Sequence, residues 1–127
     1  MYKELIISII IIIIIFSLDL FTQNYTEKSV DKITKQFSDL KTYISENNTE
    51  KIQQIIKNIN NDWERMHDKL AYYIEHDELE KVDTAITVMK SYIETEEFSL
   101  AIAELEEGKF VLEHIQEKNS FNLENIF

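Results

Sequence analysis

The sequence predicts an all-α protein in which an N-terminal single transmembrane helix continues into an antiparallel, up-down-up-down four-helix bundle. The first observation behind this prediction is that nine of the ten residues from Ile6 to Ile15 are isoleucine. A helix that is apolar on every side must be buried in protein or lipid, and lipid is the better host here. The second is that proline is absent and glycine occurs once, at Gly108, which leaves few residues for tight β-turns or phosphate loops.

The apolar run predicts a transmembrane signal anchor over residues 1–23. The segment from Leu5 to Leu18 carries no charge. At about −0.3 to −0.6 kcal/mol for each Ile, Leu or Phe, its insertion outweighs the cost of one aspartate, Asp19. Extended to Phe21 the run has 17 residues, which cover about 25 Å of a roughly 30 Å hydrocarbon core. The small residues of a signal-peptidase site are missing, which favours an uncleaved anchor over the alternative, a cleaved signal peptide.

The short N-terminal flank predicts the orientation of this anchor. It carries Lys3 beside Glu4 and is followed at once by the apolar run. This layout is typical of a signal anchor that leaves its N-terminus in the cytoplasm and exports the rest of the chain. We therefore expect residues 24–127 to form an extracytoplasmic domain on a single-pass protein of the cell membrane.

Composition narrows the possible partners and chemistry. The formal net charge is −11, and residues 61–127 carry 17 acidic and six basic groups. An acidic surface repels nucleic acid and anionic lipid head groups, so we expect no nucleic-acid partner. The chain has no cysteine, which excludes disulfides, thiolate catalysis and cysteine-based metal sites. Stability must therefore come from packing.

Four segments after the anchor carry apolar residues at every third or fourth position, the spacing of one helix face. The helices are expected at about residues 26–45, 49–75, 78–95 and 97–117, followed by an apolar tail at 119–127. Short connections make successive helices antiparallel neighbours. The second helix, about 27 residues and ~40 Å long, should overhang its partners or bend. The tail is too apolar for a solvated end, so we expect it to dock on the bundle.

Polar residues between these segments predict the helix ends. Asn48 or Thr49 can cap the second helix, and Asp77 can cap the third by accepting a hydrogen bond from a backbone N–H of the first turn. Gly108 lies on the apolar stripe of the fourth helix. Its missing side chain permits close approach of a neighbouring helix, at a cost of ~1 kcal/mol relative to alanine.

Several blocks of the chain together resemble a known family. They are the aliphatic N-terminal segment, Trp63, and the stretches 70–79, 110–115 and 123–127. On these residues the chain resembles a domain-of-unknown-function family, family 4363, which comprises uncharacterised short membrane-anchored helical proteins of clostridial-type bacteria. The resemblance implies a helical architecture and an envelope location. It implies no activity and no catalytic residue.

Two arrangements contain residue types that can bind metals. Glu64 and His67 form a Glu-x-x-His motif, but a di-iron bundle needs two such motifs, so we interpret the pair as solvated. The topology also brings His76 and Asp77 near His114 at the membrane-proximal end of the bundle. Imidazole and carboxylate groups there suit Zn²⁺ or Mn²⁺, or a pH sensor. The favoured interpretation is that these residues cap helices, with no metal site.

Three aromatic residues are candidates for packing or contact. Trp63 lies on the apolar stripe of the second helix, so a core position is favoured over a binding surface. Tyr72 and Tyr73 are adjacent and face different ways, so one of them is expected to touch lipid head groups or the tail. Together with Asp77 and Gly108 these are the expected structural or interaction residues.

No nucleophile–base pair, phosphate loop or cofactor motif is recognisable, so we expect a non-enzymatic protein without catalytic or cofactor-binding residues. The leading hypothesis is a protein-interaction or structural module at the outer face of the bacterial membrane. Its partners would be the membrane, through one span, and an envelope protein. The alternative is a ligand- or metal-binding sensor or carrier that uses the membrane-proximal end of the bundle.

Overall fold

The structure is a computed structural model that describes the backbone of residues 1–126 and the side chains of residues 1–120. It contains four helices: α1 (Tyr2–Ser45), α2 (Thr49–Leu70), α3 (His76–Glu94) and α4 (Phe98–Ile126). No strand occurs among the described residues. The all-α prediction is therefore confirmed. The predicted docking of the tail side chains lies outside the described residues.

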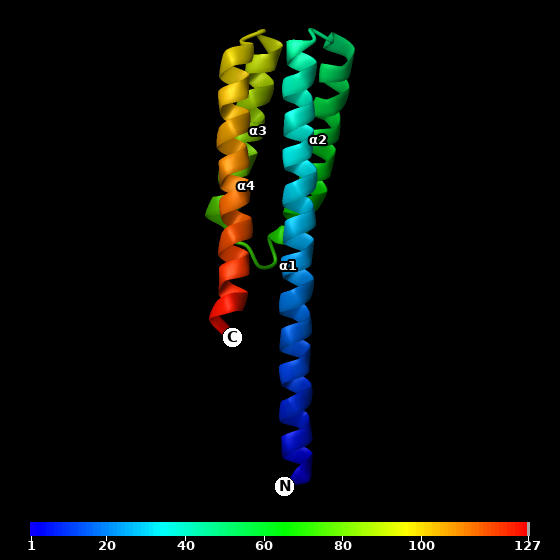
Figure 1. Ribbon diagram of the computed structural model, residues 1–127, viewed down its shortest axis with the longest axis vertical. Helices are drawn as coiled ribbons and strands as arrows, with labels where there is room; N and C mark the ends of the chain where they lie inside the picture. The colour runs from blue at the N-terminus through cyan, green and yellow to red at the C-terminus, as the bar shows by residue number, and fades with distance from the viewer. Residues whose placement is uncertain (127) are drawn as a thin grey trace.

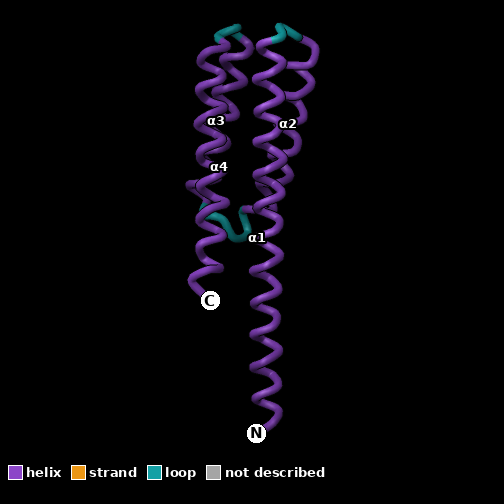
Figure 2. The backbone as a smooth tube through the Cα atoms, in the orientation of Figure 1, coloured by secondary structure: helices purple, strands orange, loops and turns teal. Residues whose placement is uncertain are grey.

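The helices lie side by side, and α1 is much longer than the others (Figure 1). Its N-terminal part projects alone from one end of the assembly, which we call the base. The α2–α3 loop lies at the base, and the α1–α2 and α3–α4 connections lie together at the opposite, distal end (Figure 2). α1 packs against α2 and α4, and α4 also packs against α3, whereas α2 and α3 make only a slight contact.

α1 is one continuous helix, but its first part is exposed and its second part belongs to the core of the bundle. The isoleucines from Ile6 to Ile15 are each 48 to 57% exposed. From Thr26 onward the same helix contributes one face to the core, through Val30, Ile33, Phe37, Leu40 and Ile44. In the described part of the chain, α1 is the helix long and apolar enough to cross a membrane, a property that signal sequences share.

The core is built from the apolar stripes of all four helices. Each stripe places its residues three or four positions apart, so that they share one side of the helix. The largest fully buried side chains come from every helix: Ile33, Leu40, Ile59, Leu70, Leu79, Met89, Leu105, Leu112 and Ile115. Trp63 is buried with them, as its place on the stripe of α2 predicts.

The α2–α3 loop differs from the sequence prediction. α2 ends at Leu70 and has 22 residues. It therefore does not extend to residue 75, and it is not long enough to overhang its partners as predicted. The chain tightens after Leu70: the N–H groups of Tyr73 and Ile74 both donate to its carbonyl, at 3.0 and 2.8 Å. Both side chains still pack against the core from the loop. Their apolar character therefore continues the helical spacing where the helix itself has ended.

The other helix ends follow local hydrogen bonding. Asn48 caps α2 by accepting a bond from the backbone N–H of Lys51 at 3.1 Å, as its position predicts. α4 continues to Ile126 and not to residue 117. No proline or glycine interrupts the segment after Gly108, and Asn119 and Ser120 make hydrogen bonds to α1.

Candidate functional site

The base of the bundle brings together segments that are far apart in the sequence. The loop of residues 71–75 and the residues of α4 around Ser120 lie beside α1 just after its apolar run, and the first turn of α3 packs against α4 (Figure 1). This end contains most of the residues that the sequence nominates. Its polar contacts form two clusters, one of hydroxyl groups and one of ions.

The hydroxyl cluster centres on Thr26, whose side chain is fully buried. Its hydroxyl donates to the carbonyl of Thr22 at 2.8 Å and lies 2.8 Å from the hydroxyl of Tyr73. The Tyr73 hydroxyl also donates to the Thr22 carbonyl at 3.1 Å. Burial raises the pKa of Tyr73, although its hydrogen bond with Thr26 opposes that effect. The phenol therefore stays neutral and holds the loop on α1.

α4 joins the same cluster from its other side. The amide of Asn119 donates to the hydroxyl of Thr26 at 3.4 Å, and the amide of Gln23 donates to the hydroxyl of Ser120 at 3.0 Å. Three chain segments therefore meet at one point of α1. We call Thr22, Thr26, Tyr73 and Asn119 the base clamp.

The ionic cluster connects α3 and α4. His114 Nε2 lies 3.5 Å from Glu78 Oε1, and Lys118 Nζ lies 3.2 Å from Glu75 and 3.7 Å from Glu78. The hydrogen bond that Lys118 donates to Glu75, together with the charges of Glu78 and Glu75, raises the pKa of Lys118. The structure thus places His114 near the start of α3. The carboxylates there already face an ammonium group, which the sequence analysis did not include.

His76 and Asp77 do not join this ionic cluster. His76 is the first residue of α3 and is exposed. Asp77 is exposed and lines a shallow groove between α3 and α4 with Glu80, Glu104 and Glu107. Within the described residues, no group of three or more His, Asp or Glu side chains is placed to hold a metal ion.

The prediction that Asp77 caps α3 is wrong. The cap is Glu75, whose backbone is extended at φ −58° and ψ 135° and whose side chain makes no capping hydrogen bond. The helix begins earlier than expected because the carbonyl of Glu75 already accepts bonds from the N–H groups of Glu78 and Leu79. Asp77 lies inside the first turn, where a carboxylate interacts favourably with the helix dipole.

A second polar group lies between α2 and α3, which make only a slight contact with each other. The indole N–H of Trp63 donates to Asp83 at 2.5 Å, and His67 Nε2 lies 3.3 Å from the same carboxylate. The rings of Trp63 and His67 meet edge to face, with centroids 6.0 Å apart. An open groove of about 390 Å³ lies beside them. His67 therefore faces Asp83, while Glu64 is exposed.

Sequence reasoning did not identify Asp83 as a partner of these residues. The available signal was Trp63 itself, because a buried indole N–H requires an acceptor. The sequence could not say which carboxylate provides it, since Asp83 lies 20 positions further along the chain.

Another carboxylate that sequence reasoning missed lies between α1 and α2. Asp62 is buried, accepts a hydrogen bond from Gln36 at 2.7 Å and pairs with Arg65 and Lys32. Burial by itself raises the pKa of Asp62, but these hydrogen bonds and positive charges together outweigh it and lower that pKa. Asp62 is therefore an ionised group that fixes how α2 lies against α1.

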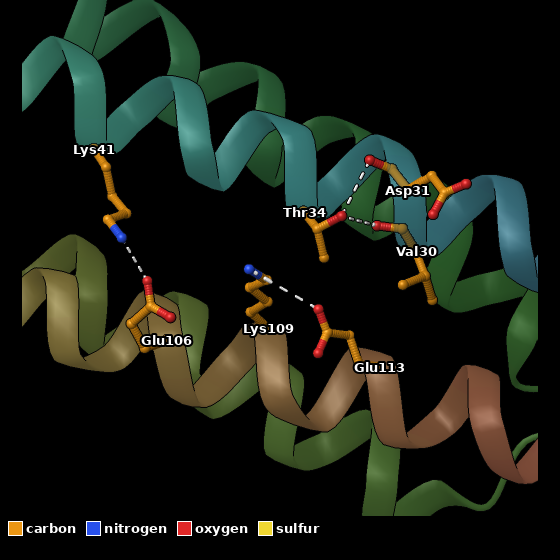
Figure 3. A network of polar contacts seen from close by, with 7 residues as sticks. All are labelled: Val30, Asp31, Thr34, Lys41, Glu106, Lys109 and Glu113. Carbon is orange, nitrogen blue, oxygen red and sulfur yellow. Dashed lines mark hydrogen bonds and ion pairs between the residues drawn. The ribbon is translucent and has the colours of Figure 1, made fainter.

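The interface between α1 and α4 carries a charged contact and a close approach. Lys41 of α1 reaches Glu106 of α4 at 2.7 Å, which lowers the pKa of Glu106 (Figure 3). A methyl group at Gly108 would lie 3.3 Å from the ring of Phe37 and 3.4 Å from Ala85. Gly108 therefore lies where α1, α3 and α4 converge, in agreement with the close approach expected from the sequence.

Tyr72 and Tyr73 differ strongly in environment. Tyr73 is half-buried in the base clamp, whereas Tyr72 is 90% exposed. Phe110, on the outer side of α4, is 71% exposed. Among the side chains described for the bundle, these two exposed rings are the largest that face the surroundings.

Comparison with known proteins gives one result. No curated protein and no solved structure matches the chain. A family model described as a domain of unknown function (DUF4363) matches residues 20–126. The match begins at the end of the apolar run and includes the whole bundle, and it agrees with the resemblance found in the sequence. The chain therefore belongs to the DUF4363 family.

Proposed function

We propose that the protein is a membrane-anchored, non-enzymatic interaction module. In this proposal α1 crosses the cell membrane through residues 1–23, with its N-terminus in the cytoplasm. It holds an antiparallel, up-down-up-down four-helix bundle at the outer face, where the bundle contacts another envelope protein. The observation that carries the proposal is that α1 is one unbroken helix, exposed and apolar in its first part and part of the bundle core in the rest.

The exposure of the isoleucine block supports a membrane span. An isolated apolar helix in water would form a patch far larger than the few hundred Å² that soluble monomers usually expose. None of the most apolar 18-residue stretch of α1 is buried against the rest of the protein. Transfer of this stretch into lipid removes the apolar surface from contact with water. The backbone N–H and C=O groups need no water there, because they are hydrogen-bonded to each other within the helix.

The polar groups of the bundle support a role in protein–protein contact rather than a role in catalysis. Tyr73, Asp62 and Asp83 each bond to groups on another helix or loop, so that they connect segments of the bundle. The grooves between the helices are open and shallow. A surface with exposed aromatic residues such as Phe110 amid acidic groups suits a partner that carries basic residues around an apolar pocket.

The orientation can be tested because the native chain has no cysteine. Single cysteines are introduced by Glu50→Cys at the distal end and Lys3→Cys before the span. A membrane-impermeant maleimide should label Glu50→Cys in intact cells and Lys3→Cys only after permeabilisation. Labelling of both in intact cells would contradict the span, and the reverse pattern would contradict the orientation.

Partner contact can be tested by site-specific cross-linking in cells. A photoreactive amino acid at Phe110 should yield one dominant cross-linked protein, identified by mass spectrometry. The matched control carries the same group at Glu50, which is also exposed but lies on α2. Absence of any cross-link at Phe110, or cross-links only to further copies of this chain, would contradict the proposal.

A further inference from the structure

α4 continues past the base, beside the apolar run of α1. Gln23 of α1 bonds to Ser120 of α4 at 3.0 Å, and α4 remains helical as far as Ile126. The two helices run in opposite directions (Figure 1). Because each rises by about 1.5 Å per residue, the six residues beyond Ser120 descend ~9 Å. The end of α4 is therefore level with Ser17, inside the segment that α1 would place in the membrane.

The burial pattern of α1 agrees with this register. From Met1 to Phe21 every residue is exposed except two, Phe16 and Asp19, which are partly buried. These two continue the spacing of Gln23 and Thr26, at steps of three, four and three positions, so that all four share one face of the helix. Gln23 and Thr26 on this face contact α4. Phe16 and Asp19 therefore lie on the face of α1 that meets α4 at the base clamp.

The sequence of this last part of α4 suits a membrane interface. Residues 121–126 contain three apolar residues, two asparagines and one glutamate. This mixture is too polar for the hydrocarbon core and too apolar for a solvated end. The α2–α3 loop, which presents Tyr72, lies level with the start of this segment, because Tyr73 contacts Thr22 and Thr26 just after the apolar run. An exposed tyrosine is a residue that lipid head-group layers accommodate.

We propose that the end of α4, residues 121–126, is a second membrane element that lies in the head-group layer of the leaflet next to the bundle. The inference rests on the proposed function, since it requires that α1 spans the bilayer. Its partner is the lipid surface itself. Because the protein is strongly acidic, neutral lipid head groups suit this contact better than anionic ones. The base clamp then fixes the bundle directly on the membrane.

The experiment measures the depth of single labelled positions in the full chain. Asn122→Cys, Ile10→Cys and Glu50→Cys each carry an environment-sensitive fluorophore, and the protein is reconstituted in phosphatidylcholine vesicles. Lipids with a nitroxide near the head group or deep in the acyl chain then quench the label. We expect strongest quenching at Asn122→Cys by the shallow nitroxide and at Ile10→Cys by the deep one. Glu50→Cys, at the distal end, should not be quenched.

The outcomes separate this inference from the proposed function. Quenching at Ile10→Cys with none at Asn122→Cys would overturn the interfacial element and leave the span intact. Equal quenching of both by the deep nitroxide would also overturn it, since α4 would then enter the hydrocarbon core. Absence of quenching at Ile10→Cys would instead contradict the span. Glu124→Cys repeats the measurement on the same segment if Asn122→Cys does not fold.

Discussion

The hydroxyl groups of Tyr73 and Thr26 lie 2.8 Å apart, so that the α2–α3 loop is bonded to α1 just after its apolar run. Thr26 is fully buried, and its hydroxyl also contacts Asn119 of α4. One residue of α1 therefore connects to both other segments at the base.

Replacement of the tyrosine tests this connection. Tyr73→Phe removes a hydroxyl that bonds to both Thr26 and the carbonyl of Thr22. We expect the free energy of unfolding to fall by about 1 kcal/mol, the usual net value of a partly buried hydrogen bond. Urea titration in mild detergent, followed by the fluorescence of Trp63, measures it. Tyr72→Phe is the matched control on an exposed ring, and an equal effect in both variants would contradict a specific role for the clamp.

The buried carboxylate of Asp62 predicts a pH dependence. Its pKa is lowered in the folded protein, so it contributes stability above its unfolded pKa of about 3.9 and loses that contribution as the pH falls through the folded value. We expect Asp62→Asn to be less stable than the native protein by about 1 kcal/mol at pH 7. The two should converge below about pH 4.

Unfolding curves at several pH values check this expectation. Asp68→Asn is the control, because Asp68 is an exposed aspartate on the same helix. Its difference from the native protein should stay within about 0.5 kcal/mol across the range. A constant difference between Asp62→Asn and the native protein down to pH 3 would show that shape, not charge, matters at this position.

The two helix starts predict unequal effects of the same substitution. Asn48→Ala removes the side chain that caps α2 and should cost about 1 kcal/mol. Asp77→Ala removes only a favourable interaction with the dipole of α3, worth about 0.3–1 kcal/mol at low salt. Thermal unfolding at low and high salt separates them, because only the effect at Asp77 should shrink with added salt. A larger loss of stability in Asp77→Ala that does not depend on salt would show that Asp77 does cap α3.

The sequence predicted the helices and most core positions because one face of each helix repeats every three or four residues. Ile33, Trp63 and Leu105 are buried where that spacing puts them. It misplaced the end of α2 because Tyr73 and Ile74 are apolar and continue the same spacing, although they pack from a loop. Periodicity reports which side chains are buried, and it cannot report whether the backbone beneath them is still helical.

Polar partners were harder to predict than apolar ones. Topology alone suggested that His114 approaches the start of α3, where it faces Glu78. The partners of Asp62 and Trp63 lie on other helices, and nothing in the local sequence identifies Gln36 or Asp83. Such pairs depend on the rotation and height of two helices relative to each other, and spacing along one helix does not contain that information.

The surroundings of Gly108 predict that only a small side chain fits at this position, where α1, α3 and α4 converge. Gly108→Ala gains helix propensity of ~1 kcal/mol but brings a methyl group within 3.3 Å of the Phe37 ring, so the net change should be small. Gly108→Val adds atoms for which no space exists and should destabilise the protein by about 1–3 kcal/mol. Urea unfolding of both variants measures the difference. Equal stability of the two would mean that α1 and α4 can move apart at this point.

The alternative function, metal binding at the base, predicts stabilisation by a metal ion. A ligand that binds only the folded state raises its stability by RT ln(1 + [L]/Kd), about 2.7 kcal/mol at 100 times Kd. Glu75 and Glu78 already pair with Lys118, so a metal would have to displace that ammonium group before His114 and Glu78 could bind it. We therefore expect Zn²⁺, Mn²⁺ and Fe²⁺ to leave the melting temperature of the full protein unchanged.

Two variants make this expectation decisive. Lys118→Ala frees both carboxylates and is the form in which weak metal binding would be easiest to detect, whereas His114→Ala removes the one imidazole that faces them. A rise in melting temperature with Zn²⁺ that increases in Lys118→Ala and disappears in His114→Ala would establish a metal site and favour the sensor or carrier. An unchanged melt in all three proteins assigns the cluster to the packing of α3 against α4, in which Lys118 and His114 hold the carboxylates at the start of α3.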